Sequence, residues 1–144
     1  MTEGGCLCGR VRYRLHAKPH HVCDCHCIDC RRATGAPFVT WGIVARDKLE
    51  IQSGEVRTIR HAGRIRSFAA CCGTPLFFQD DDTATSIDVT IASLDDPVPF
   101  APELTIWTED RLPWVHLDST RPALRQNKRE DTGPGAPGKP DTEQ

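Results

Sequence analysis

The chain has 144 residues and a formal net charge of −2, from 18 basic and 20 acidic residues. This length suits one domain, and the small acidic excess leaves no surplus of lysine and arginine to neutralise nucleic-acid phosphates. The N-terminus lacks a basic stretch followed by an apolar one, and the longest apolar run, near 41–45, is far below the roughly 20 residues of a spanning helix. We therefore expect a soluble cytoplasmic protein with no nucleic-acid partner and no membrane partner.

Short runs of alternating apolar and polar residues predict strands over most of the chain. The first, Arg10–Leu15, puts Val11, Tyr13 and Leu15 on one face. The segment Cys27–Thr34 has a weak helical pattern, and Gly35 can cap its end. Further strands are predicted over 38–45, 49–52, 55–60, 64–69, 74–79, 86–93 and 104–108. The pattern indicates a mainly β domain of short strands over residues 1–120.

The remaining residues, 121–144, are predicted to form a polar tail. From residue 126 onward the chain is rich in Lys, Glu, Asp, Pro and Gly, with almost no apolar side chains. Such a segment cannot bury enough apolar surface to offset its ordering entropy, so we expect this tail to be disordered.

Eight cysteines occur at positions 6, 8, 23, 25, 27, 30, 71 and 72. A disulfide framework fits poorly, because the expected compartment is reducing and because Cys6–Cys8 and Cys71–Cys72 are too close in sequence for unstrained bridges. Metal binding explains them better. Four thiolates or imidazoles complete a closed structural zinc site, whereas three leave a position for water or substrate.

Three motifs occur in a fixed order. They are G-x-C-x-C-G at 4–9, C-H-C-x-x-C at 25–30 followed by R-R-A-T-G-A-P-F, and C-G-T-P-L at 72–76, with I-W-T-E-D-R-L-P-W at 106–114. With these motifs the chain resembles the glutathione-dependent formaldehyde-activating enzyme (GFA) family, also called the centromere protein V/GFA domain, over about residues 4–118. The resemblance implies a mainly β, Mss4-like zinc-binding fold of short antiparallel strands.

The resemblance also implies roles for the cysteines. Cys6 and Cys8, with two cysteines of the third motif, look like a structural zinc site. Cys25, Cys27 and Cys30 look like the three-thiolate site, with a second zinc, at which chemistry occurs, and are therefore the candidate catalytic residues. The implied activity is that of a zinc-dependent carbon–sulfur lyase acting on S-(hydroxymethyl)glutathione or a related adduct, with a small thiol such as glutathione as partner.

The third motif departs from the family pattern. The family usually has Phe-Cys-x-x-Cys-Gly, but here Ala69 holds the position of the first cysteine and Cys71 is adjacent to Cys72. We expect Cys71 to supply the fourth thiolate in its place. The alternatives are a water ligand or a more weakly bound zinc.

Other interpretations of the second motif stay open. Cys25, Cys27 and Cys30 also suit a second structural site with Cys23 or His26 as fourth ligand. We expect His26 to point away, because its neighbours Cys25 and Cys27 occupy the same side of an extended chain. If this second site is also structural, the alternative function of the chain is that of a non-catalytic, zinc-stabilised binding module.

Charged residues near the motifs also have two interpretations. Asp24 and Asp29 are either acid–base groups or, as we expect, turn residues bonded to backbone amides. The arginines are either a solvated face or a site for the carboxylates of a ligand. They are Arg31, Arg32, Arg57, Arg60, Arg64 and Arg66.

Overall fold

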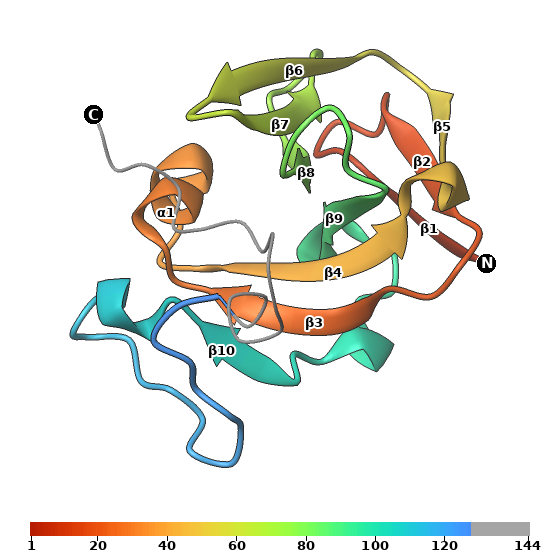
Figure 1. The fold of residues 1–144 in the computed structure, drawn as a ribbon. Coiled ribbons are helices and arrows are strands. Elements are labelled where there is room, and N and C mark those ends of the chain that lie inside the picture. Colours follow the sequence, from red (N-terminus) through yellow and green to blue (C-terminus); the bar gives the residue numbers. More distant parts are fainter. Residues whose placement is uncertain (128–144) are drawn as a thin grey trace.

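Two β-sheets form the molecule in the computed structural model, which describes residues 1–127. The smaller sheet has the order β1-β2-β5, with all pairs antiparallel, and the larger has the order β10-β3-β4-β9-β8-β7-β6 (Figure 1). In the larger sheet the short β10 runs parallel to β3, and the other pairs are antiparallel. The strands are β1 (Thr2–Gly5), β2 (Arg12–Leu15), β3 (His20–Cys25), β4 (Val39–Ala45), β5 (Leu49–Ser53), β6 (Val56–His61), β7 (Arg64–Ala69), β8 (Pro75–Gln79), β9 (Ser86–Thr90) and β10 (Leu104–Ile106).

The helices are short. The α-helix α1 (Ile28–Thr34) follows β3 and lies on the opposite side of the molecule from the small sheet (Figure 1). Gly35 ends it in the left-handed conformation, with φ 65°, and donates its N–H to Arg31. The predicted helix and its glycine cap are therefore confirmed. Single turns of 3-10 helix are η1 (Arg46–Lys48), η2 (Ile91–Ser93), η3 (Val98–Phe100) and η4 (Thr108–Asp110).

The larger sheet separates two cores, because successive side chains on a strand point to opposite faces. One face packs against the smaller sheet. There Val11, Tyr13 and Leu15 are fully buried, as their alternation predicts, against Val22, Val44, Phe77, Ile87 and Val89 of the larger sheet. On the other face lie the three cysteines 25, 27 and 30, with Val39, Trp41, Leu104, Ile106 and Trp107.

The mainly β fold of short strands is confirmed, with the one parallel pair as a difference. Two strands were not predicted, and each lacks a strand-like composition. The sequence of β3 is HHVCDC, and that of β1 is TEGG. A Cβ on Gly4 would clash with the Tyr13 hydroxyl, so close packing on Tyr13 requires glycine there. The predicted strands 86–93 and 104–108 end early, in η2 and η4.

The first residues of the predicted tail are part of the described fold. Ala123 pairs with Thr105 as a parallel bridge, Leu124 donates its N–H to the Thr105 carbonyl, and Trp107 donates to Gln126. The outer edge of β10 is therefore covered by chain beyond residue 120. Residues 128–144 of the predicted tail lie outside the described residues. Among residues 1–127, none of the helices is long and apolar enough to cross a membrane.

Candidate metal centres

The second motif folds as a strand end, a helix cap and a first helical turn. Cys25 is the last residue of β3, Cys27 is the N-cap of α1, and Cys30 lies in the first turn. The Cys27 sulfur accepts a hydrogen bond from the backbone N–H of Cys30 at 3.2 Å, as a serine cap would. This path brings the three Sγ atoms within 4.8 Å of one another.

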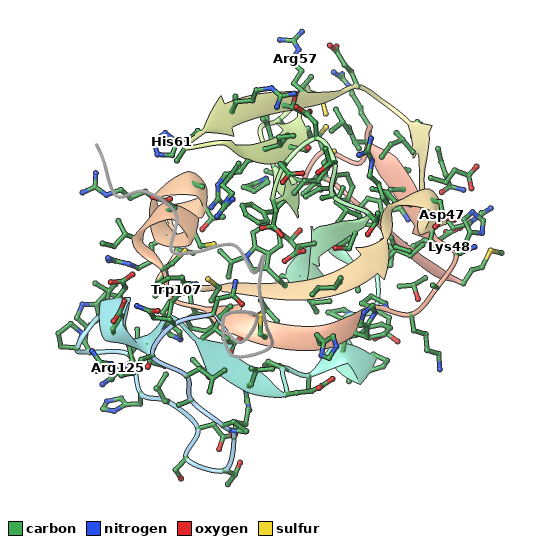
Figure 2. The ribbon with its side chains drawn as sticks, in the orientation of Figure 1. Asp47, Lys48, Arg57, His61, Trp107 and Arg125 are labelled. Carbon is green, nitrogen blue, oxygen red and sulfur yellow. The ribbon has the colours of Figure 1, made fainter. Side chains whose placement is uncertain are left out.

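This cluster is enclosed by aromatic and aliphatic side chains. Its three cysteines are each at most 5% exposed, and they pack with Trp41 of β4 and with Trp107. Trp107 follows β10 in the left-handed conformation, with φ 57°, and Figure 2 shows it beside the start of α1. A non-glycine residue held in this conformation is sterically strained, and such strain is typical of sites where the surroundings fix one side chain.

Without a cation, the cluster favours one thiolate among three sulfurs. Hydrogen bonds with the other two thiols, and then burial, raise the pKa of Cys25 well above that of an ordinary thiol. The hydrogen bond with Cys25 lowers the pKa of Cys27, but that with Cys30, together with burial, outweighs it and raises this pKa to about 12. Hydrogen bonds from both partners, and then the charge of Arg66, hold the pKa of Cys30 well below its usual range despite burial. A divalent cation removes this conflict, because it favours all three thiolates.

Arg66 of β7 contacts the cluster directly. Its two terminal nitrogens lie 3.9 and 3.7 Å from the Cys30 sulfur. Its guanidinium carbon lies 4.9 Å above the ring centre of Phe78, the residue directly opposite on β8. The Phe78 ring is in turn 6.0 Å from that of Trp41. The sequence pointed to Arg66 only as one of several arginines. It included Trp107 in the motif at 106–114, but it gave no signal for Trp41 or Phe78.

The proposed fourth ligands do not join this cluster. Neither Cys23 nor His26 belongs to the group of donors that lie within 4.8 Å of one another. The His26 side chain is buried against Phe38, with ring centres 5.0 Å apart, and burial lowers its pKa. The donor set in the described residues therefore has three thiols, the number found in zinc sites with an open position.

Of the two aspartates beside the cluster, Asp24 differs from expectation. Asp24 lies in β3 and accepts a hydrogen bond from the Thr40 hydroxyl at 2.6 Å and one from Arg121 at 3.3 Å. It bonds to side chains rather than to backbone amides, because it is part of a strand rather than a turn. Asp29 is 6% exposed in the first turn of α1.

A second cluster joins the first and third motifs. The sulfur–sulfur distances are 3.7 Å for Cys6–Cys8, 3.7 Å for Cys6–Cys71, 3.2 Å for Cys8–Cys71 and 3.9 Å for Cys71–Cys72. Four sulfurs at the usual zinc–sulfur bond length in a tetrahedron are about 3.8 Å apart. The number, type and spacing of these donors therefore fit a closed zinc site.

The local backbone explains why these four sulfurs meet. Gly9 donates its N–H to the Cys6 carbonyl and closes a tight turn, and the Val11 N–H donates to the Cys6 sulfur at 3.3 Å. Cys71 lies in the turn between β7 and β8, and its sulfur belongs to the same group of donors as those of Cys6, Cys8 and Cys72. Ala69 is fully buried in the core between the sheets.

Two of the other arginines named from the sequence lie away from the cluster, on the surface of the molecule. Arg57 and Arg60 lie on the exposed strand β6, where they pair with Glu55 and Asp82, and Figure 2 shows Arg57 pointing away from the molecule. For these two, the solvated-face interpretation agrees with the structure.

Known proteins resemble this chain in sequence and in fold. The profile of the family described as "Glutathione-dependent formaldehyde-activating enzyme" matches residues 1–110. The chain belongs to this family. A relative from Halomonas elongata, named "Putative glutathione-dependent formaldehyde-activating enzyme", is 24% identical in an alignment of 130 residues that covers 83% of this chain and 82% of the relative.

A solved structure supports the fold of this GFA-family chain. The crystal structure of a Rhodobacter sphaeroides protein matches with a TM-score of 0.55 and 20% identity, over 69% of this chain and 94% of that one. At this level of identity the likeness concerns the fold alone.

Proposed function

We propose that this chain is a zinc-dependent carbon–sulfur lyase, acting in the cytoplasm on the adduct of formaldehyde with glutathione or a related thiol. In this proposal Cys25, Cys27 and Cys30 hold the reactive zinc, and Cys6, Cys8, Cys71 and Cys72 hold a structural zinc. The observation that carries the proposal is a buried cluster of three thiols with no fourth donor among the described residues, in a member of a glutathione-dependent family.

The reaction joins a thiol to an aldehyde. The thiolate sulfur attacks the formaldehyde carbon, the carbonyl π electrons move to oxygen, and that oxygen takes up a proton to give S-(hydroxymethyl)glutathione; cleavage is the reverse. A free thiol is only slightly ionised at neutral pH. Zinc, when bound, supplies the positive charge that favours the thiolate form.

The side chains around the cluster determine which step is assisted. Three cysteine thiolates leave the centre with a net negative charge, so it is a weak Lewis acid, and we infer that it positions the thiol rather than strongly activating the carbonyl. Trp41 and Trp107 exclude water from one side of the cluster. Arg66 brings a positive charge into direct contact with the Cys30 sulfur.

The test is the rate at which formaldehyde exchanges between its free and glutathione-bound forms, measured by exchange NMR with ¹³C-formaldehyde. The zinc-loaded protein is expected to accelerate this exchange, and Cys27→Ser to abolish the acceleration. Serine is a good helix N-cap, so this variant removes a thiolate while keeping the cap of α1. It should keep the structural metal and its fold. Cys23→Ser is the matched control, because Cys23 lies in the same core but outside the donor group.

The alternative, a non-catalytic zinc-stabilised binding module, is favoured by one observation: the three thiols are almost completely buried. It predicts that the loaded protein leaves the exchange rate unchanged. It also predicts that Cys27→Ser lowers stability, as loss of a structural ligand does. These two results together would replace the enzymatic proposal.

A further inference from the structure

We propose that Arg66 is a positioning residue that keeps the Cys30 sulfur a metal ligand and suppresses its reaction with the aldehyde. This inference rests on the proposed function, because it assigns a task that arises only where a metal-binding thiolate meets an electrophilic substrate.

The geometry holds the guanidinium in one place. Arg66 lies in the middle of β7, paired on both sides, opposite Ile59 of β6 and Phe78 of β8. Its guanidinium stacks on the Phe78 ring, and that ring contacts Trp41, a buried member of the cysteine core. Both terminal nitrogens then reach a single sulfur. A planar donor fixed in this way loses little further conformational freedom when it hydrogen-bonds to a thiolate.

The contact is specific to Cys30. Among the hydrogen bonds that the structure describes for Arg66, both go to the Cys30 sulfur. The neighbouring Arg60, by contrast, forms an exposed pair with Asp82 at 2.7 Å. The charge of Arg66 is therefore directed at one corner of the cluster, in a half-buried place where solvent screening is weaker than at the surface.

The contact between Arg66 and Cys30 bears on a side reaction of the cysteine thiolates with formaldehyde. Any nucleophilic thiolate can add to formaldehyde: a sulfur lone pair forms the C–S bond, and the carbonyl oxygen takes a proton from water. The three cysteines thus compete with the incoming thiol for the aldehyde. Charge-assisted hydrogen bonds from a guanidinium withdraw electron density from the sulfur and compensate its negative charge. Arg66 thereby lowers the reactivity of Cys30, and the aldehyde reacts with the free thiol instead.

The experiment compares Arg66→Gln, Arg66→Lys and wild type, each loaded with Co²⁺ in place of zinc. One readout is the sulfur-to-cobalt charge-transfer spectrum. The other is the rate of iodoacetamide alkylation of each cysteine at fixed pH, located by peptide mass spectrometry. Arg57→Gln is the control, because Arg57 is exposed and pairs with Glu55.

For Arg66→Gln we expect alkylation of Cys30 to rise about tenfold, as the loss of roughly one charge-assisted hydrogen bond predicts. The charge-transfer band should move to lower energy, because the sulfur becomes a stronger electron donor. Arg66→Lys keeps the charge but not the planar guanidinium, so its rate of Cys30 alkylation and its charge-transfer energy should lie between those of wild type and Arg66→Gln. Arg57→Gln should behave as wild type.

Three results overturn the inference, and each has a distinct meaning. An Arg66→Gln protein with an unchanged spectrum and unchanged Cys30 alkylation contradicts the role of Arg66 alone. Equal acceleration at Cys25, Cys27 and Cys30, with Arg66→Lys as fast as Arg66→Gln, shows that the substitution merely opens access to the cluster. Failure of this cluster to take up cobalt in the wild type overturns both this inference and the proposed reactive zinc. Absence of lyase activity with the expected alkylation pattern contradicts only the proposed function.

Discussion

At the scale of single residues, the third motif brings the Cys71 sulfur into the same group of donors as Cys6, Cys8 and Cys72. Ala69, at the position where the family resemblance led us to expect a cysteine, is fully buried in the core. Cys71 lies in the β7–β8 turn, with its sulfur 3.2 Å from that of Cys8 and 3.7 Å from that of Cys6. A turn allows adjacent side chains to approach a common point, which an extended strand does not. The sequence led us to expect that Cys71 replaces the cysteine missing at position 69, and the turn geometry explains how its sulfur reaches the group.

Tyr13 leads to a prediction about pH. Its hydroxyl is buried and lies 2.6 Å from the Ser93 hydroxyl, and burial raises its pKa to about 12. An unfolded tyrosine ionises near pH 10, so between these values the unfolded chain loses a proton that the folded chain keeps. The unfolded state is then favoured as pH rises, and the stability contributed by the neutral hydroxyl, fully present below about pH 10, falls by roughly 2 kcal/mol by pH 12.

The measurement is urea unfolding of wild type and Tyr13→Phe at several pH values from 9 to 12 with metal retained. Taking the difference between the two proteins removes the effects of pH on cysteines, lysines and metal, which both share. The wild type should lose stability relative to Tyr13→Phe as pH rises. A difference that stays constant over this range would show that Tyr13 titrates normally in the fold.

At the scale of secondary-structure elements, sequence patterns found the strands whose alternation faces a core. The predicted strand at 64–69 has the same bounds in the structure, and the predicted buried face consists of Val11, Tyr13 and Leu15. The patterns missed β3, because five of its six residues are histidine, cysteine or aspartate, and none of these is a β-branched residue of the kind that is enriched in strands. Its strand conformation comes from pairing with β4 and β10, which both come later in the chain and which a local sequence pattern therefore does not reveal.

The outer edge of β10 gives the prediction at this scale. Residues 122–126 cover that edge with backbone hydrogen bonds, Leu124 packs onto the cysteine core, and Arg121 bonds to Asp24. Ending the chain after residue 120 removes these contacts, whereas ending it after residue 127 keeps them. We expect the shorter chain to lose about 3 kcal/mol of unfolding free energy, from several backbone hydrogen bonds at about 1 kcal/mol each.

Thermal and urea unfolding of the two truncated chains, each compared with the full chain, measures this difference. Hydrogen exchange at the amides of Thr105 and Trp107 gives a local readout, because both pair with the segment that is removed. The chain ending at 127 should match the full chain in both experiments. If the chain ending at 120 is equally stable and equally protected, the originally predicted domain boundary at residue 120 is the better one.

At the scale of the whole molecule, the two cysteine clusters differ in their surroundings. One joins the turn before β2 to the β7–β8 turn and packs on the core between the sheets, with Cys8 and Cys71 exposed. The other is enclosed in the core on the far face of the large sheet. The family resemblance led us to expect these two groups of cysteines, but neither it nor their spacing carries information on burial. That difference in burial arises only when the sheets pack. It leads us to expect different rates of release for the two proposed metal ions.

We therefore predict that a strong chromogenic chelator removes the two zinc ions in separate phases. The ion at the exposed cluster should leave first, because the chelator can reach Cys8 and Cys71 without any opening of the fold. The ion at the buried cluster should leave more slowly, at a rate limited by local opening around α1. The first phase should also lower the melting temperature, because it breaks a link between segments more than 60 residues apart in the sequence.

Two variants assign the phases. Cys71→Ser should remove the fast phase and Cys27→Ser the slow one, each with loss of one zinc per chain by mass spectrometry. Cys23→Ser should keep both phases, because Cys23 belongs to neither donor group. Loss of the fast phase in Cys27→Ser would contradict the assignment, since it would mean that the enclosed cluster is the more accessible one. In that case segment 122–126 and α1 would have to open readily enough to admit both chelator and substrate, and the burial of the three thiols would no longer limit access to the proposed reactive metal.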